Sequence, residues 1–213
     1  MNDLGERLAR NPFVAILRGV RPDEVESIAE ALLAEGVEIL EVPLNSPQPL
    51  DSIERLAKRF GGRALVGAGT VLDAASADAV ARAGARIAVM PNADAEVVRA
   101  SKAAGMIAMP GFLTPSEAFA MLAAGADALK LFPAEASSPG VLQAMRAVLP
   151  PGTGVLPVGG VRPDNLGPWL AAGAVGFGIG SAIYKPGSTP EAVRERARAF
   201  NEALRAVPRK LSV

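Results

Sequence analysis

Residues 83–110, AGARIAVMPNADAEVVRASKAAGMIAMP, contain one complete structural unit and the beginning of the next. A small-residue turn around Gly84 precedes a short apolar run, a loop follows the run, and an amphipathic stretch leads to a second small-residue turn around Gly105. Each glycine is typical of a helix C-cap, after which a new strand begins. This stretch therefore predicts a strand followed by a helix.

The same order recurs along the chain. Gly84 and Gly105 are 21 residues apart and Gly105 and Gly125 are 20 apart, whereas Gly36 to Gly84 and Gly125 to Gly173 each span 48 residues, about two units. The apolar runs between these turns predict eight strands. They lie at residues 13–17, 37–42, 64–68, 86–90, 106–109, 127–132, 154–158 and 175–179.

Eight alternating strand–helix units are the number that closes a barrel. We therefore expect an α/β fold, a single (β/α)8 TIM barrel domain over residues 1–213, with a short N-terminal helix at residues 1–10 and the last helix at residues 190–206. A doubly wound open sheet is the competing architecture. It is disfavoured because the glycine-rich loops at residues 67–69 and 176–180 do not fit the Gly-x-Gly-x-x-Gly dinucleotide fingerprint.

The composition excludes several classes of function. Lys plus Arg and Asp plus Glu both number 22, with no basic block, so a nucleic-acid surface is disfavoured. The chain contains no Cys and no His, which excludes disulfides, thiolate nucleophiles and serine–histidine–aspartate hydrolysis and disfavours a zinc site. No run approaches about 18 apolar residues, and charged residues interrupt any secretory segment. We expect a cytoplasmic protein without metal, cofactor, nucleic-acid partner or membrane contact.

Lys130 is the one lysine of five that lies within an apolar strand, ADALKLF at residues 126–132. Burial lowers the pKa of an ammonium group, and a neutral amine is a nucleophile toward carbonyl groups. Ala128 shares the face of Lys130 and leaves room beside the amine, whereas we assign Phe132 to the core, turned away from Lys130. Two interpretations remain open: a lysine that forms an imine, or one whose head reaches solvent or pairs with a carboxylate.

Glu41 ends the second expected strand, so its carboxyl group enters the same barrel mouth as Lys130. A carboxyl group there could carry the protons that imine and enamine chemistry requires. Alternatively, Glu41 is an ion-pair partner of Lys130 or Arg18. Glu38 lies on the opposite face of the strand by alternation, and we expect it to face the helices and to be structural.

Two more polar residues follow strands at this mouth. Arg18, after the first strand, could hold an anionic group with its planar guanidinium, or form a salt bridge at the rim. Thr70, after Gly67-Ala68-Gly69, could receive a carboxylate with its hydroxyl group, or act as the N-cap of the next helix.

Glycines follow both the seventh and the eighth expected strands. Gly159 and Gly160 come after the seventh, and Gly180 and Ser181 after the eighth. In (β/α)8 enzymes these two loops commonly bind phosphate, because unobstructed amides favour an anion. The alternative is that these glycines only form tight turns.

Taken together and in order, eight segments resemble the class I aldolases that cleave 2-keto-3-deoxy-6-phosphosugar acids. The likeness covers nearly the whole chain, from Phe13 to about Phe200. The segments are VAILRGV (14–20), EVPLNSP (41–47), VGAGTVL (66–72), MPN (90–92), MPGFLTPSEAF (109–119), ALKLFP (128–133), LPVGGVRPDNL (156–166) and GIGSAIY (178–184).

The resemblance implies roles for individual residues. Lys130 matches the lysine that forms the imine with pyruvate, and Glu41 matches its acid/base partner. Thr70 matches the residue that meets the pyruvate carboxylate, Arg18 a substrate-contacting arginine, and Phe132 an aromatic beside the imine, contrary to our alternation count. The other matches are a pocket-wall proline, Pro91, and the phosphate-binding positions Gly159, Gly160, Gly180 and Ser181.

Asn45 distinguishes two branches of this family. Phosphogluconate-type members carry an arginine four residues after the glutamate, whereas Asn45 within EVPLNSP resembles the phosphogalactonate branch. We therefore include Asn45 among the substrate-binding residues. The expected reaction is cleavage of 2-dehydro-3-deoxy-6-phosphogalactonate to pyruvate and D-glyceraldehyde 3-phosphate by a lyase without a cofactor. The resemblance also implies a homotrimer.

Other functions remain open at this point. The gluconate epimer, or both epimers, could be the substrate, and so could short non-phosphorylated 2-keto acids. A phosphosugar epimerase or isomerase would share the phosphate loops but usually uses His, which is absent. A non-enzymatic phosphosugar-binding barrel would retain the same loops, but it would not need an isolated strand lysine opposite a glutamate.

Overall fold

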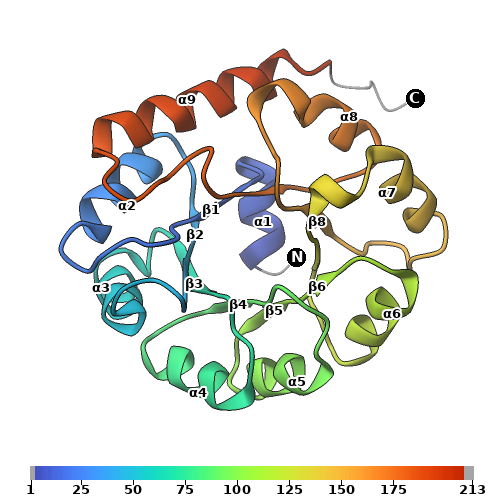
Figure 1. The fold of residues 1–213 in the computed structure, drawn as a ribbon, viewed down its shortest axis with the longest axis horizontal. Helices are drawn as coiled ribbons and strands as arrows, with labels where there is room; N and C mark the ends of the chain where they lie inside the picture. Colours follow the sequence, from blue (N-terminus) through green and yellow to red (C-terminus); the bar gives the residue numbers. More distant parts are fainter. Residues whose placement is uncertain (1–2, 209–213) are drawn as a thin grey trace.

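The computed structural model describes residues 3–208, in which short parallel strands alternate with helices around a ring (Figure 1). The strands are β1 (Phe13–Ile16), β2 (Ile39–Pro43), β3 (Leu65–Gly69), β4 (Ile87–Val89), β5 (Ile107–Met109), β6 (Gly111–Phe112), β7 (Leu129–Leu131), β8 (Val155–Pro157) and β9 (Phe177–Ile179). The helices are α1 (Asp3–Arg10), α2 (Val25–Ala34), α3 (Pro49–Phe60), α4 (Ala74–Arg82), α5 (Ala95–Ala103), α6 (Pro115–Ala123), α7 (Pro139–Arg146), α8 (Leu166–Ala171) and α9 (Pro190–Ala206), with 3-10 turns η1 (Ala134–Ala136) and η2 (Pro163–Asn165).

The expected closed (β/α)8 TIM barrel is wrong. Hydrogen bonds join the strands into two parallel sheets, a six-stranded sheet in the order β5-β4-β3-β2-β1-β9 and a three-stranded sheet in the order β6-β7-β8. The chain passes from one sheet to the other at Pro110, which has no backbone N–H to donate. At the second junction, a single bridge links Val158 to Gly178. The alternation of strands and helices was predicted correctly, but the strands do not join into one closed sheet as expected.

Most element positions follow the sequence pattern. Each of the eight expected apolar runs overlaps a strand, although β2 and β3 each end one residue later than expected, and β6 was not expected. Five glycines that were predicted to end helices have positive φ angles of 77–102°, a backbone region that glycine adopts easily. They are Gly36, Gly84, Gly105, Gly125 and Gly173. The last helix occupies the expected residues 190–206. The N-terminal helix expected at residues 1–10 is observed as α1 at Asp3–Arg10, and residues 1–2 lie outside the described part.

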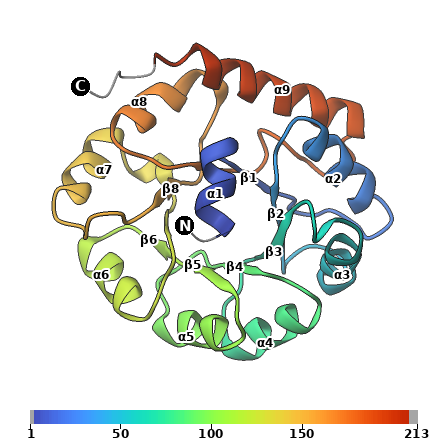
Figure 2. The same cartoon turned by 180° about the vertical axis from the view of Figure 1, so that it is seen from behind.

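Two clusters of buried apolar side chains pack the strands and helices together. The larger one lies between the outer faces of the strands and the helices. The smaller one lies between the two sheets and includes Val14, Ile39 and Leu156. Leu4 and Leu8 of α1 belong to this smaller cluster, so α1 covers the amino-terminal ends of the strands, as the view from behind shows (Figure 2).

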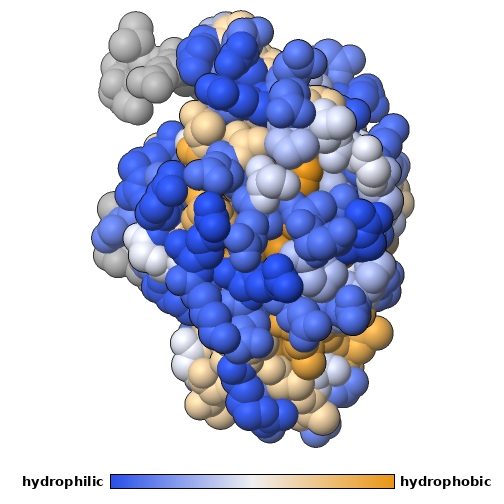
Figure 3. Space-filling model, turned by 90° about the vertical axis from the view of Figure 1, so that its left-hand side faces the viewer, coloured by the Kyte–Doolittle hydropathy of each residue, from blue (hydrophilic) through white to orange (hydrophobic). Residues whose placement is uncertain are grey.

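The outer surface on the side of α2 and α3 is mainly hydrophilic (Figure 3). This distribution is expected for helices that bury one face against a sheet. Within residues 3–208, no helix combines the length and apolar character that a membrane crossing needs. Because all strand pairs are parallel, the carboxyl ends of the strands gather at the end of the ring opposite α1.

Candidate active site

Lys130 lies in the middle of β7, paired in register with Gly111 of β6 and Leu156 of β8. Its side chain faces the space between the sheets, on the same side as Ala128, and the residue is only 4% exposed. The alternative in which its head reaches solvent is therefore wrong. Burial lowers the pKa of the Lys130 ammonium group, so the neutral amine becomes accessible at lower pH than for an ordinary lysine.

Glu41 reaches the same space from β2, where it pairs with Ile16 of β1 and Gly67 of β3. Glu41 is 2% exposed. Among the described residues its Oε2 atom has no hydrogen-bond partner. Room for the carboxyl group comes from Gly69, because a Cβ atom there would lie 1.5 Å from Oε2. A larger residue at position 69 would displace the Glu41 side chain.

The two buried groups influence each other electrostatically. Burial raises the pKa of Glu41 to about 7, while the positive charges of Lys130 and Arg18 lower it. The negative charge of Glu41 raises the pKa of Lys130, against the effect of burial. A carboxyl group with a pKa near neutrality can both release and accept protons at physiological pH. The pair can therefore provide a nucleophilic amine beside a proton carrier.

Our assignment of Phe132 to the core was wrong. Residues two apart in a strand share a face, and the Nζ atom of Lys130 lies 4.6 Å from the centroid of the Phe132 ring. The ring is only partly buried and forms one side of the space around the amine. Pro91, at the end of β4, packs closely against Gly111, since a Cβ atom at Gly111 would lie 2.3 Å from the Pro91 carbonyl oxygen.

Arg18 and Asn45 meet at the rim of the site. The Arg18 Nη1 atom donates a hydrogen bond of 2.6 Å to the Asn45 Oδ1 atom. The partner of Arg18 is thus an amide, not the carboxylate of the rim salt bridge that we considered. Both residues are exposed. The loop behind Arg18 is held by a second contact, in which the Gly19 amide donates to the Ser46 hydroxyl oxygen at 2.9 Å.

Thr70 directly follows β3 and has a left-handed backbone conformation, with φ of 58°. This conformation is strained for a β-branched residue and is typical of functional sites. The N-cap interpretation is wrong, because α4 is capped by Asp73, whose carboxylate accepts a hydrogen bond of 2.7 Å from the Ser76 amide. The Thr70 side chain is therefore available for another partner.

The two glycine loops lie side by side. Val158 and Gly178 form the bridge between the sheets, so Gly159–Gly160 and Gly180–Ser181 emerge from neighbouring strands. Gly159 and Gly160 have φ angles of 103° and 63°, which side chains rarely adopt, so these two also form tight turns. At Gly180 there is more space, because the nearest atom to an added Cβ would be 4.0 Å away.

Glu135 is an acidic residue near these loops that was not among the predicted site residues. The Glu135 side chain, from η1 after β7, lies directly against Gly159 and Gly160: Cβ atoms added there would approach its Oε2 atom to 2.1 Å and its Cγ atom to 2.7 Å. Its position could have indicated a role, because it lies five residues after Lys130, in the loop that follows the same strand.

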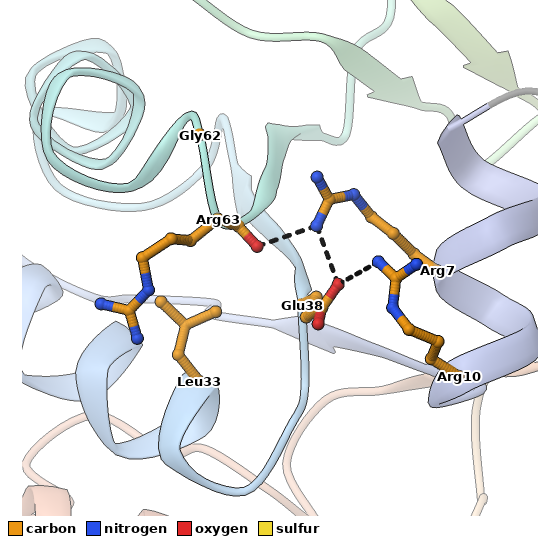
Figure 4. Close-up of a pocket in the computed structure, with 6 residues that line it drawn as sticks. All are labelled: Arg7, Arg10, Leu33, Glu38, Gly62 and Arg63. Atoms are coloured by element: carbon orange, nitrogen blue, oxygen red, sulfur yellow. Dashed lines mark hydrogen bonds and ion pairs between the residues drawn. The ribbon is translucent and has the colours of Figure 1, made fainter.

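Glu38 is far from this site and has a structural role, as expected. It faces α1, where Arg7 and Arg10 donate to it at 2.9 and 2.6 Å. These residues line a cavity of about 350 Å³, in which Arg7 also donates to the Arg63 carbonyl oxygen (Figure 4). A larger cavity of about 1180 Å³ lies next to it, between α1, α8 and α9. Neither cavity contains any of the predicted site residues.

Comparison with known proteins places this geometry in a family. The family model of the KDPG and KHG aldolases matches residues 4–192 of this chain. The chain belongs to this aldolase family. It is 45% identical to the 2-dehydro-3-deoxy-6-phosphogalactonate aldolase of Escherichia coli K12, over 91% of this chain and 95% of that one. It is 33% identical to the KHG/KDPG aldolase of the same organism, over 87% and 86% of the two chains.

A structural comparison agrees with the sequence relationships. A solved native KDPGal structure superposes with a TM-score of 0.90 at 44% identity, and the match covers 92% of this chain and 95% of that one. The family resemblance that the sequence motifs indicated is therefore confirmed. The described residues hold no cluster of three or more His, Cys, Asp or Glu side chains that could bind a metal ion.

Proposed function

We propose that this chain is a class I aldolase that cleaves 2-dehydro-3-deoxy-6-phosphogalactonate to pyruvate and D-glyceraldehyde 3-phosphate, with Lys130 as the imine-forming residue and Glu41 as the acid/base. One observation carries the mechanism: a buried amine with a lowered pKa and a buried carboxyl group with a pKa of about 7 face the same space. The galactonate aldolase relative supports the choice of substrate.

The reaction begins when the lone pair of neutral Lys130 attacks the C2 carbonyl carbon of the substrate. A proton moves from the attacking nitrogen to the C2 oxygen, protonated Glu41 then delivers its proton to the resulting hydroxyl group, the C2–O bond breaks as water leaves, and a cationic imine forms. The Glu41 carboxylate then accepts the proton of the C4 hydroxyl group. The O–H electron pair forms the C4 carbonyl, the C3–C4 bond breaks, and its electrons pass into the imine to form a neutral enamine. Glyceraldehyde 3-phosphate is released.

The same two residues complete the cycle. Protonated Glu41 returns its proton to C3 of the enamine, which regenerates a cationic imine, now of pyruvate. Water adds to C2 and gives one proton to the Glu41 carboxylate; the remaining hydroxyl proton moves to the nitrogen, and the C2–N bond breaks as the C2 carbonyl forms, which releases pyruvate and restores neutral Lys130 and protonated Glu41. Phe132 stands beside the amine and limits access of bulk water to the imine. The imine nitrogen provides the electron sink, so the mechanism needs no metal.

The other site residues bind the two charged ends of the substrate in this proposal. The Thr70 hydroxyl group and the neighbouring amides hold the carboxylate, and Pro91 shapes the pocket wall. Arg18 and Asn45 contact the substrate from the rim, where their mutual hydrogen bond fixes the guanidinium. The amides of Gly159, Gly160 and Gly180 and the hydroxyl group of Ser181 hold the phosphate ester, because they come from adjacent strand ends.

The identity of the C4 epimer is tested most directly by an assay coupled to lactate dehydrogenase. Pyruvate release is measured from the galactonate and gluconate forms of the phosphorylated substrate under the same conditions. We expect a higher kcat/KM for the galactonate form. A preference for the gluconate form would assign the chain to that substrate, equal values would indicate an aldolase for both epimers, and no release from either would favour a non-enzymatic binding protein.

We further propose that the enzyme is a homotrimer in the cytoplasm. Exposed apolar side chains just before α4 and at α6 support association of copies: Leu72 is 52% exposed, Phe119 44% and Leu113 37%. Size-exclusion chromatography with light scattering measures the assembly mass, for which three times 21.8 kDa is expected. A monomer mass at working concentration would refute the trimer.

A further inference from the structure

The position of Glu135 conflicts with the chemistry of the loop beneath it. Its carboxylate lies against the Cα atom of Gly159, because the Oε2 and Cδ atoms would lie 2.1 and 2.9 Å from a Cβ atom added there. This is the loop to which the proposed function assigns the phosphate ester. A carboxylate beside this loop opposes a second anion, because like charges a few ångströms apart repel each other, and more strongly in partly buried positions.

No other interaction of the Glu135 side chain holds it against Gly159 and Gly160. Glu135 is exposed, and within residues 3–208 its carboxylate has no hydrogen-bond or ion-pair partner. It is carried by η1, a single 3-10 turn, where Ala136 N donates to Pro133 O at 3.0 Å. The side chain can therefore leave the glycine loop by rotation about its own bonds, without any change in the backbone.

We propose that Glu135 is an affinity-setting and specificity-determining residue, an internal competitor for the anion seat formed by Gly159 and Gly160. In the free enzyme its carboxylate stands beside this seat without accepting a hydrogen bond from either glycine amide, and its negative charge opposes an approaching anion; it rotates away when the phosphate ester of the substrate binds. This inference rests on the proposed phosphate site. The Glu135 carboxylate lowers the affinity of every anion for the Gly159–Gly160 loop by the same factor.

The consequence differs between a free and a tethered anion. The phosphate of the substrate is linked to a chain held at Lys130 and Thr70, so its effective concentration at the seat is high, and it displaces Glu135. Inorganic phosphate, or the carboxylate of a second pyruvate molecule, has no such link and is kept out. Glu135 therefore prevents small free anions from blocking the site while the complete substrate still binds.

The test compares three variants with the wild-type enzyme. Glu135→Gln removes the charge and retains the size, whereas Glu135→Ala removes both. Asp164→Asn is the matched control, because Asp164 is an exposed carboxylate in η2, just beyond the same loop, whose side chain pairs with Arg162 at 3.2 Å. The dissociation constant of inorganic phosphate is measured by calorimetry. KM is measured for the phosphorylated substrate and for its non-phosphorylated counterpart.

We expect both Glu135 variants to bind inorganic phosphate about tenfold more tightly, which corresponds to about 1.4 kcal/mol. KM for the phosphorylated substrate should fall, KM for the non-phosphorylated compound should stay the same, and Asp164→Asn should change phosphate affinity by less than about twofold. Unchanged or weaker phosphate binding in both Glu135 variants would overturn the proposal, as would an equal gain in Asp164→Asn. If wild-type enzyme prefers the phosphorylated substrate in that case, only the role of Glu135 fails; if it shows no such preference, the proposed phosphate site fails too.

Discussion

Replacement of Glu41 by Gln should reduce turnover and at the same time stabilise the fold at neutral and alkaline pH. Burial raises the pKa of Glu41 from 4.5 to about 7. Because the folded state holds this proton more tightly than the unfolded chain, stability falls as pH rises from about 4.5 to about 7. Each pKa unit is worth about 1.4 kcal/mol, so the loss amounts to about 3 kcal/mol. The side-chain amide of the Glu41→Gln variant does not titrate, so the variant avoids this loss.

The assay is urea unfolding of both proteins at pH 4.5 and pH 8, together with steady-state pyruvate release. Between these two pH values, the free energy of unfolding of Glu41→Gln should gain about 3 kcal/mol relative to wild type. Turnover should fall by about 100-fold or more, because general acid/base catalysis is lost. Gly69→Ala should cause a similar loss of turnover, since an added Cβ atom displaces the Glu41 carboxyl group.

Glu38→Gln is the control, because it makes the same chemical change just before the same strand. It removes ion pairs with Arg7 and Arg10, so it should destabilise the protein modestly and leave turnover unchanged. The reasoning about Glu41 is refuted if Glu41→Gln retains near-normal turnover, or if its unfolding free energy follows that of wild type across the same pH range.

Three further predictions concern the metal-free mechanism, the phosphate site and Thr70. EDTA should leave activity unchanged, and activity lost to the chelator and restored by a divalent metal would contradict an imine mechanism. Gly180→Val should raise KM for the phosphorylated substrate and spare pyruvate imine formation, because a Cβ atom there meets no protein atom closer than 4.0 Å but stands where the anion approaches; equal losses with non-phosphorylated substrate would argue against a phosphate site. Thr70→Gly should unfold at no lower urea concentration than wild type, because it relieves a strained backbone, yet it should raise KM for pyruvate; unchanged KM would remove Thr70 from the site.

The sequence predicted the order of elements well because the helix ends are marked locally. Gly84 and Gly105 have the positive φ angles that a C-cap requires, and the strands follow within a few residues. Lys130 was recognisable for a related reason: a single charge within an apolar strand needs a special environment. These signals depend on few neighbours, so they are visible without the fold.

Other features depended on contacts between distant segments. The strand expected at residues 106–109 does end at Met109, but the sequence did not predict that the chain continues after Pro110 into β6 and joins a second sheet instead of completing a closed barrel. The orientation of Phe132 was assigned by a faulty count of the alternation, and the packed structure corrected it. The contact of Glu135 with Gly159 forms only when the loops after β7 and β8 meet, so no local sequence pattern predicts this contact.

Identification of the residue that forms the imine tests the account most directly. The enzyme is incubated with pyruvate and sodium borohydride, digested, and analysed by mass spectrometry. We predict a stable reduced pyruvate adduct on Lys130 alone, and no adduct in Lys130→Met. An adduct on Lys102 or Lys185, or no adduct in the wild-type enzyme, would contradict the proposed class I mechanism.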